Sequence, residues 1–236
     1  MSQGFFVTGT DTGVGKTLVA CALLHAFAAR GLRAVGMKPV AAGAEPVDQA
    51  LRNDDVELLL AAGNVAAPRE FVNPYCFTPP IAPHIAAARA GAAIAVDHIL
   101  VCYGELAARA DVVVVEGAGG FRVPLGPGAD TGDLASRLAL PVILVVGMRL
   151  GCLNHALLTA EAIAARGLTL AGWVANHVDA RMEAADENVC ALVKRLGTPL
   201  VARIAHAASI EREAIASRFD LARSGFAGGD PACNPR

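Results

Sequence analysis

A glycine-rich segment near the N-terminus constrains the fold of this chain more than any other feature. It follows an apolar, strand-like run at 4–8, opens a helical pattern at 16–30, and reads Gly9-Thr10-Asp11-Thr12-Gly13-Val14-Gly15-Lys16-Thr17. Glycines let backbone N–H groups turn inward around phosphate oxygens, and the helix N-terminus adds its positive end. The spacing is one residue longer than in G-x-x-x-x-G-K-T, because Thr10 stands where the first glycine belongs. The segment predicts a nucleotide-binding P-loop of modified form.

Apolar strand-like runs alternate with helical patterns along the whole chain. The run at 111–115 is β-branched on both faces, which is typical of a strand buried between two helical layers. We expect further strands at 34–37, 141–146, 168–174 and 199–204, and helices at 16–30, within 47–62, and at 84–90, 94–109, 153–166 and 181–196. The alternation predicts an α/β fold of the P-loop NTPase type, with a mostly parallel sheet and helices on both faces.

No linker divides the chain and no internal repeat is present. We therefore expect one domain over residues 1–224. Residues 225–236 are rich in Gly and Pro, and the sequence predicts that they form a flexible C-terminal tail.

The composition argues against several classes of protein. Lys and Arg total 20 against 22 Asp and Glu, a balance that argues against a nucleic-acid-binding protein. The mean hydropathy of +0.46 is high, but 49 alanines contribute much of it, and the longest apolar run, 138–148, is too short to span a bilayer. The N-terminus shows no signal segment. We expect a cytoplasmic protein with no nucleic-acid or membrane partner.

The six cysteines contain no C-x-x-C pair and no zinc-binding spacing. We expect them to be small buried hydrophobic residues in a reducing compartment, without a structural disulfide. The six histidines are scattered and form no H-E-x-x-H motif, so the sequence gives little support for a histidine metal site.

Lysine is rare here: only Lys16, Lys38 and Lys194 occur among the 20 basic residues. Lys16 belongs to the P-loop, where its ammonium group can reach the β- and γ-phosphates of a nucleotide. Lys38 ends the second predicted strand, at the sheet edge where the P-loop lies, and can stabilise charge on a transferring group. A solvated lysine at the end of a strand is the alternative interpretation of Lys38.

Acidic residues at the same edge predict a magnesium site. Glu116 ends the strand at 111–115 and precedes a run of glycines that lets the backbone approach a ligand closely. The hydroxyl of Thr17 is a second candidate ligand, because hydroxyl oxygens of a P-loop commonly bind Mg²⁺. Taken alone, Glu116 is open to interpretation as a surface acid at a strand end, but its place beside the P-loop favours the metal. Asp55 by itself is only slightly better explained as a ligand than as a solvated acid at a helix start.

These motifs together resemble the dethiobiotin synthetase family, and the resemblance covers about residues 5 to 204. Beyond the P-loop it rests on Lys38-Pro39-Val40-Ala41, Leu51-Arg52-Asn53, Val72-Asn73-Pro74-Tyr75, Pro83-His84, and the segments 115–120, 140–146, 150–159 and 172–176. So many ordered blocks make a chance similarity very improbable.

The resemblance implies a reaction. In this family, 7,8-diaminopelargonate takes up CO₂ as a carbamate, ATP phosphorylates the carbamate, and the second amine closes the ureido ring with release of phosphate. The resemblance also implies a Mg²⁺ cofactor held by Thr17, Asp55 and Glu116. It further implies ADP as a product and a homodimer with the substrate near its interface. Such chemistry depends mainly on positioning and electrostatics, which suits lysine point charges.

Roles for individual residues follow from the same resemblance. It implies that Lys38 and Lys16 are catalytic. It implies contacts with ATP from Gly13, Val14, Gly15, Lys16, Thr17, Leu18, Asp55, Glu116, Gly117, Ala118, Gly119 and Asn176. It implies contacts with the substrate from Thr12, Lys38, Ala42, Gly151, Cys152 and Asn154.

Two positions depart from the family pattern. Ala42 stands where the family commonly has a substrate-binding serine, so one hydroxyl contact, worth about 1 kcal/mol, is missing or replaced. Ala205-His206 stands where the family usually has Pro-Trp, near the segment expected to contact adenine. A contact through the backbone survives this change, whereas a contact through the side chain does not.

Two rival interpretations share the P-loop and the parallel sheet. A ParA/MinD-like switch ATPase would carry an early signature lysine, whereas residues 10–14 read Thr-Asp-Thr-Gly-Val. A cobyrinate-type amide ligase would carry a glutaminase region with a cysteine nucleophile, and no such region follows. We therefore favour the ring-closing enzyme.

Overall fold

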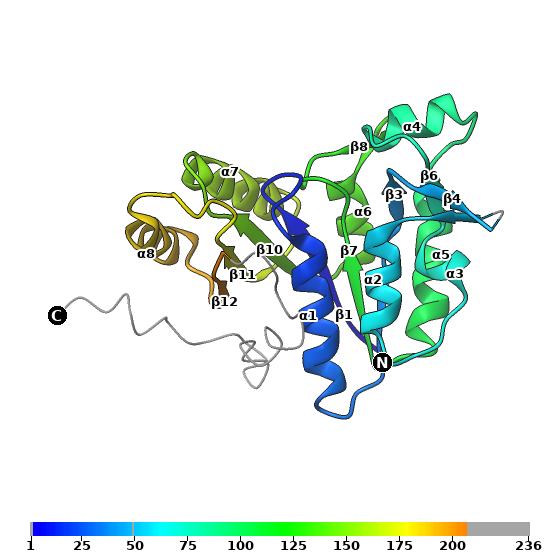
Figure 1. Cartoon of the computed structure of the whole chain (residues 1–236), viewed down its shortest axis with the longest axis horizontal. Helices are drawn as coiled ribbons and strands as arrows, with labels where there is room; N and C mark the ends of the chain where they lie inside the picture. The colour runs from blue at the N-terminus through cyan, green and yellow to red at the C-terminus, as the bar shows by residue number, and fades with distance from the viewer. Residues whose placement is uncertain (1, 49, 207–236) are drawn as a thin grey trace.

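The computed structural model describes residues 2–48 and 50–206. Its centre is a six-stranded sheet in the order β12-β11-β10-β1-β7-β2, and every neighbouring pair is parallel (Figure 1). The strands are β1 (Gln3–Gly9), β2 (Ala34–Met37), β7 (Val112–Glu116), β10 (Val142–Gly147), β11 (Leu170–Asn176) and β12 (Leu200–Ile204). The predicted α/β fold with a parallel sheet is confirmed.

Helices cover both faces of this sheet, as Figure 1 shows. The helices are α1 (Lys16–Ala28), α2 (Asp54–Ala62), α3 (Arg69–Val72), α4 (Pro83–Arg89), α5 (Val96–Ala107), α6 (Thr131–Leu138), α7 (Cys152–Ala165) and α8 (Ala185–Leu196). Alternate residues of β7 face opposite layers: Val112 and Val114 pack with α1 and α2, whereas Val113 and Val115 pack with α5 and α6. This burial on both faces explains the continuous β-branched run.

In the described part of the chain, three small strand pairs lie outside the central sheet, and none of them was predicted. They are the parallel pair β3 (Val40–Ala42) and β6 (Tyr75–Phe77), and the antiparallel pairs β4 (Glu45–Val47) with β5 (Ala50–Arg52) and β8 (Pro124–Gly126) with β9 (Ala129–Asp130). Each strand is two or three residues long, too short to give a readable alternation.

Other elements also differ from expectation. Helix α6 was not predicted, and α8 begins at Ala185 rather than 181. The helix expected within 47–62 is present as α2, and the β4–β5 hairpin precedes it. The predicted boundary at 224 and the tail at 225–236 lie outside the described residues and stay predictions. Within the described part of the chain, no helix is long and apolar enough to cross a membrane.

The expectation that the cysteines are small buried residues holds in part. Cys102 and Cys152 are buried free thiols, whereas Cys76 is a free thiol that is only partly buried.

A substitution at Gly36 of β2 tests how closely helices pack on the sheet. A Cβ placed on Gly36 of β2 would lie 2.9 Å from Leu59 Cβ and 3.1 Å from Leu24 Cδ1, so α1 and α2 both pack on this glycine. We expect Gly36→Ala to lower the free energy of unfolding by about 1–3 kcal/mol through overpacking. In Gly104→Ala, the control, the new Cβ meets nothing within 4 Å, and we expect unchanged or slightly higher stability. Urea unfolding of both variants measures the difference, and equal stabilities would contradict this packing.

Candidate functional site

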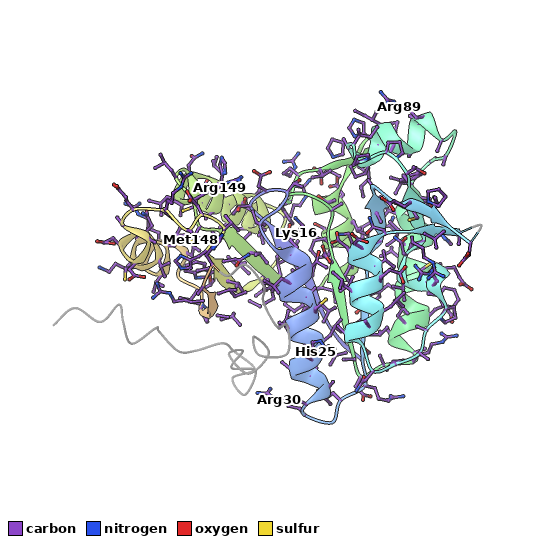
Figure 2. All side chains as sticks on the ribbon, in the orientation of Figure 1. Lys16, His25, Arg30, Arg89, Met148 and Arg149 are labelled. Carbon is purple, nitrogen blue, oxygen red and sulfur yellow. The ribbon has the colours of Figure 1, made fainter. Side chains whose placement is uncertain are left out.

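The strand order reverses around β1, which lies between β7 and β10. In open α/β sheets, ligands bind beyond the carboxyl ends of the strands at such a reversal. The P-loop leaves β1 at this edge and enters α1 at Lys16, which Figure 2 shows at the start of that helix, with His25 and Arg30 toward its other end. An ion pair between Arg149, after β10, and Asp11 ties the P-loop to the neighbouring strand.

Two glycines give the P-loop its shape. Gly13 has φ +74° and Gly15, the N-cap of α1, has φ +91°, a conformation that side chains disfavour. Gly15 also passes close to the end of β11, because a Cβ placed there would lie 2.3 Å from Asn176 Nδ2. The same Nδ2 donates a hydrogen bond to the Val14 carbonyl at 2.8 Å. The buried Asn176 amide therefore fixes the turn of the P-loop.

A cavity of about 760 Å³ opens beside the P-loop. Its polar side is lined by Thr12, Gly13, Gly15, Lys16, Thr17, Lys38, Asp55 and Glu116. Its other side is largely apolar and is lined by Val40, Ala42, Pro80, Ile81, Ala82, Pro83, Ala118, Gly119 and Val123. The cavity thus brings a charged cluster and an apolar wall to the same ligand space.

The charged cluster is built around Lys38. Its Nζ lies 2.8 Å from Asp55 Oδ2 and 2.5 Å from Glu116 Oε1. The Thr17 hydroxyl lies 2.7 Å from Asp55 Oδ1 and 2.9 Å from Glu116 Oε1. Since a hydroxyl carries one proton, Thr17 can donate to only one of these carboxylates at a time. Lys38 and Glu116 are both buried, so each depends on the other for charge compensation.

The pKa values of Lys38 and Lys16 are shifted in opposite directions. Burial acts to lower the pKa of Lys38, but the carboxylates of Glu116 and Asp55 outweigh it and hold that pKa above its ordinary value. Burial and the charge of Lys38 lower the pKa of Lys16 to about 8. The Lys16 ammonium donates a hydrogen bond to the Asp11 carbonyl at 3.0 Å. The lowered pKa means that nearby negative charge does not fully compensate the positive charge of Lys16. An anionic ligand in the cavity would supply the missing negative charge.

The cluster also suits a divalent cation. Glu116 Oε2 is buried without a hydrogen-bond partner among the described residues. No group of three or more His, Cys, Asp or Glu side chains that could hold a metal occurs in the described part of the chain. Two carboxylates and a hydroxyl are a partial oxygen set of the kind that Mg²⁺ uses when phosphates and water complete its coordination.

Some predicted site residues lie away from this cavity. Gly151, Cys152 and Asn154 lie at the start of α7 and do not line it, and the preceding Leu150 is 97% exposed. Ala205 and His206 line a second cavity of about 480 Å³, together with His177, which follows Asn176 at the end of β11. Their predicted ligand contacts stay predictions.

Most of the apolar wall was not predicted from the sequence; of its residues, only Ala42, Ala118 and Gly119 were predicted to contact a ligand. Pro80, Ile81 and Ala82 lie between β6 and α4, Pro83 begins α4, and Val123 lies between β7 and β8. The proline-rich stretch at 79–83 was a usable signal, because prolines fix backbone shape. Val123 carried no such signal, since only the folded chain places it beside the P-loop.

The two P-loop glycines make a matched test. We expect Gly15→Ala to lower affinity for a fluorescent ATP analogue at least 10-fold, because the new methyl collides with the Asn176 amide. Gly13 has a similar positive φ, but a Cβ placed there meets nothing within 4 Å. For Gly13→Ala we therefore expect only the backbone strain of a side chain at positive φ, about 1 kcal/mol, and a correspondingly smaller loss of affinity. Equal losses in the two variants would show that the contact with Asn176 does not shape the P-loop.

Comparisons with known proteins agree with this geometry. A protein-family model described as an AAA domain matches residues 3–214. Solved structures of a ParA family ATPase from Chlorobium tepidum (TM-score 0.55, 14% identity, 92% of this chain and 90% of that one) and of MinD from Pyrococcus horikoshii (0.54, 15%, 93% and 87%) share the fold.

Two curated relatives are much more similar, and both are named ATP-dependent dethiobiotin synthetase BioD. The protein from Nitrosospira multiformis is 54% identical over 96% of this chain and 98% of its own length. The protein from Aromatoleum aromaticum is 54% identical over 93% and 97%. The chain therefore belongs to the ATP-dependent dethiobiotin synthetase family.

Proposed function

We propose that this chain catalyses the ATP-dependent carboxylation and ring closure of 7,8-diaminopelargonate with CO₂, giving dethiobiotin, ADP and phosphate. The observation that carries the proposal is the cavity where Lys38, two carboxylates and the P-loop face an apolar wall. The names of the two relatives at 54% identity support the same reaction. Likeness to ParA and MinD at 14–15% identity reflects the fold alone.

ATP binds along the P-loop in this proposal. The backbone N–H groups from Gly13 to Leu18 surround the phosphates, and Lys16 contacts the β- and γ-phosphates. The glycine turn at 117–119 approaches the nucleotide from β7, and Asn176 lies next to the adenine. The depressed pKa of Lys16 supports this arrangement, because a bound triphosphate would compensate its buried charge.

Mg²⁺ is the proposed cofactor, held by Thr17, Asp55 and Glu116. The Thr17 hydroxyl lies within 3 Å of one oxygen of each carboxylate, and the buried, unpartnered Glu116 Oε2 adds a further candidate ligand atom. When bound, Mg²⁺ would screen the negative charge on the β- and γ-phosphate oxygens.

The diamino acid occupies the rest of the cavity. Its aliphatic chain suits the apolar wall of Val40, Pro80 and Ile81, whose burial by the ligand is favourable. Thr12 and Lys38 lie at the P-loop side, where the two amines and the carbamate would meet the nucleotide. Ala42 lines the cavity as well, so the methyl that replaces the usual serine adds apolar surface in place of a hydroxyl.

Lys38 is the proposed catalytic residue at the reacting atoms. One substrate amine attacks CO₂ and loses a proton, forming a carbamate. A carbamate oxygen attacks the γ-phosphorus and ADP leaves, giving a carbamic-phosphoric anhydride. The second amine then attacks the carbonyl carbon, loses a proton and expels phosphate. Lys38 would stabilise the negative charge shared by carbamate and γ-phosphate, and its raised pKa keeps it an ammonium throughout.

Removal of the Lys38 charge tests the reaction. With Mg-ATP, bicarbonate and 7,8-diaminopelargonate, we expect Lys38→Met to lower the rate of ADP formation by about 10²–10³-fold, the cost typical of losing one group that stabilises developing charge. Affinity for ATP should change much less, because Lys16 and the P-loop backbone bind the phosphates. Lys194→Met, in the last turn of α8, is the matched control and should behave as the unaltered protein.

The assay also separates the rival function. ADP formation that depends on the diamine supports the cyclisation, whereas diamine-independent hydrolysis stimulated by DNA or lipid would support a switch ATPase. Normal turnover in Lys38→Met would contradict the assigned role of Lys38.

A homodimer would bring Gly151, Cys152 and Asn154 to the substrate. These residues do not line the cavity of their own chain, and the turn N–H groups at the start of α7 suit the carboxylate tail of a substrate held by a second copy. Leu150, just before α7, is 97% exposed and Leu158, on α7, is 56% exposed, so both present apolar surface to solvent. We place this dimer in the cytoplasm, with no nucleic-acid or membrane partner.

A charged substitution at Leu150 tests whether the start of α7 lies at a dimer interface. We expect Leu150→Asp to shift the protein toward monomer in light scattering and to raise the KM for the diamine at least 10-fold, because the tail site of the partner is lost. Val101→Asp changes another exposed apolar residue, 62% exposed on α5, and should leave the dimer intact. An unchanged dimer and KM in Leu150→Asp would contradict an interface at the start of α7.

A further inference from the structure

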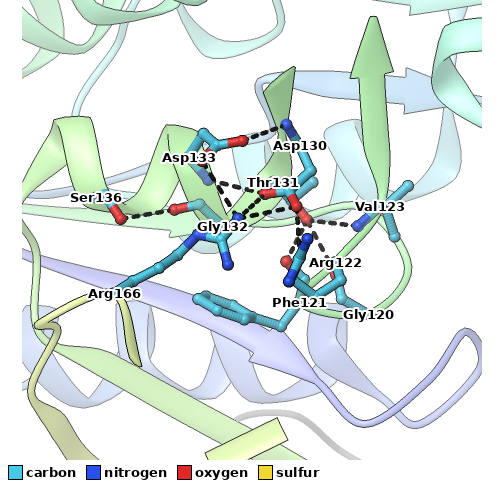
Figure 3. A network of polar contacts seen from close by, with 10 residues as sticks. All are labelled: Gly120, Phe121, Arg122, Val123, Asp130, Thr131, Gly132, Asp133, Ser136 and Arg166. Atoms are coloured by element: carbon cyan, nitrogen blue, oxygen red, sulfur yellow. Dashed lines mark hydrogen bonds and ion pairs between the residues drawn. The ribbon is translucent and has the colours of Figure 1, made fainter. Parts of the chain in front are cut away.

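The connection from β7 to β8, residues 117–123, forms one wall of the cavity, and we call it the β7 loop. Ala118, Gly119 and Val123 line the cavity from it. Its first residue, Gly117, donates to the Val7 carbonyl of β1 at 2.9 Å. Among the described residues, the hydrogen bonds to 120–123 come from the start of α6, as Figure 3 shows. The shape of this wall therefore depends on α6.

Thr131, the first residue of α6, makes most of these bonds. Its backbone N–H donates to the Val123 carbonyl at 2.9 Å, and its hydroxyl oxygen accepts from the Val123 N–H at 3.1 Å. The hydroxyl proton is directed to the Phe121 carbonyl at 2.7 Å. Thr131 is 3% exposed, so water does not replace these bonds easily. A buried hydroxyl thus holds two residues of the β7 loop.

The Thr131 hydroxyl is available to the loop because other residues cap the helix. Asp130 and Asp133 form a capping box: the Asp130 carboxylate accepts from the Asp133 N–H at 2.9 Å, and the Asp133 carboxylate accepts from the Asp130 N–H at 2.8 Å. A capping box satisfies free N–H groups of a first helical turn. The contact of Thr131 with the loop is therefore additional to what α6 needs for its own stability.

Arg166 supports the same segment from the end of α7. Its Nη2 lies 2.9 Å from both carboxylate oxygens of Asp130, and its guanidinium carbon lies 5.7 Å from the centre of the Phe121 ring. Gly132 leaves room for this arrangement, since a Cβ there would lie 2.7 Å from Arg166 Nε. Arg122 of the loop pairs with Asp130 as well, at 2.5 Å. The network in Figure 3 thus ties three consecutive loop residues to two helices.

The β7 loop also lies close to the P-loop, through Gly119 and Thr12. Gly119 has φ +60°, and a Cβ placed there would lie 3.0 Å from Val123 Cγ2 and 3.5 Å from Thr12 Oγ1. Val123 therefore packs against Gly119, and Gly119 faces the Thr12 side chain. A shift of Val123 would widen or close the space beside Thr12, where the proposed function places the reacting end of the substrate.

We infer that Thr131 is a positioning residue: its hydroxyl holds the β7 loop so that Val123 and Gly119 keep the cavity wall in place beside Thr12. Arg166, through Asp130 and Phe121, supports the same wall. Thr131 does not line the cavity, so its effect on catalysis acts through the loop. The expected change in KM rests on the proposed function. The hydrogen bonds between Thr131 and the β7 loop do not, because they are present in the chain without substrate.

Three hydroxyl variants test this inference. Thr131→Val keeps the shape of the side chain and removes both hydroxyl bonds, whereas Thr131→Ser keeps the hydroxyl. Ser136→Ala, the control, removes a hydroxyl of the same helix that donates only to the Gly132 carbonyl, at 2.9 Å. Arg166→Met serves as a second, independent variant of the network.

The first measurement is amide hydrogen exchange without substrate. We expect Thr131→Val to raise exchange in peptides covering 118–123 at least 10-fold, Arg166→Met to raise it about 3-fold, and Thr131→Ser and Ser136→Ala to leave it within 2-fold. Unchanged exchange in Thr131→Val would overturn the inference. The thermal unfolding temperature of each variant, measured alongside, shows whether it is folded.

The second measurement is steady-state kinetics with the diamine. We expect Thr131→Val to raise the KM for the diamine at least 5-fold with a smaller change in the KM for ATP, and Thr131→Ser to restore both. Looser loop exchange with unchanged kinetics would overturn the positioning role. If the unaltered protein does not turn over the diamine, the proposed function fails, and the exchange result alone then decides whether Thr131 holds the loop.

Discussion

The buried contact between Lys38 and Glu116 is the interaction on which the candidate site depends. Lys38 is only 5% exposed, toward the cavity, and Glu116 only 1%, so removal of one would leave the other as an uncompensated buried charge at a cost of about 3–5 kcal/mol. The contact joins the ends of β2 and β7, and Thr17 and Asp55 join it to α1 and α2. Four elements therefore meet at one charged cluster, which fixes where a phosphate can bind.

Around this cluster, the chain separates charge from apolar surface. The P-loop side carries both lysines, whereas Val40, Pro80 and Ile81 form a wall without charge. Such a division suits a ligand that is anionic at one end and aliphatic along its length. Strand β3, the segment that leads into α4 and the β7 loop supply the apolar side, so the part of the fold outside the central sheet decides which small molecule fits.

Sequence reasoning worked where one physical rule dominated. The β-branched run of β7 is buried on both faces, and the P-loop glycines need positive φ, so both features are readable locally. Prediction failed for β3, β8 and α6, which are short and depend on contacts with distant segments. It also missed Val123 and Thr131, because an aliphatic residue and a threonine have no distinctive pattern until the fold places them beside the P-loop.

The sequence by itself determined the parallel α/β fold and the P-loop, because glycine conformation and strand burial are properties of local residues. From charge chemistry and family resemblance it also predicted Lys16, Lys38, Asp55 and Glu116 as site residues. Only the tertiary structure decided that Lys38 lies between the two carboxylates, that Asn176 supports the P-loop, and that α6 holds the β7 loop. Each of these contacts joins residues between 10 and 162 positions apart. Such contacts depend on how the whole chain packs, and local patterns do not encode them.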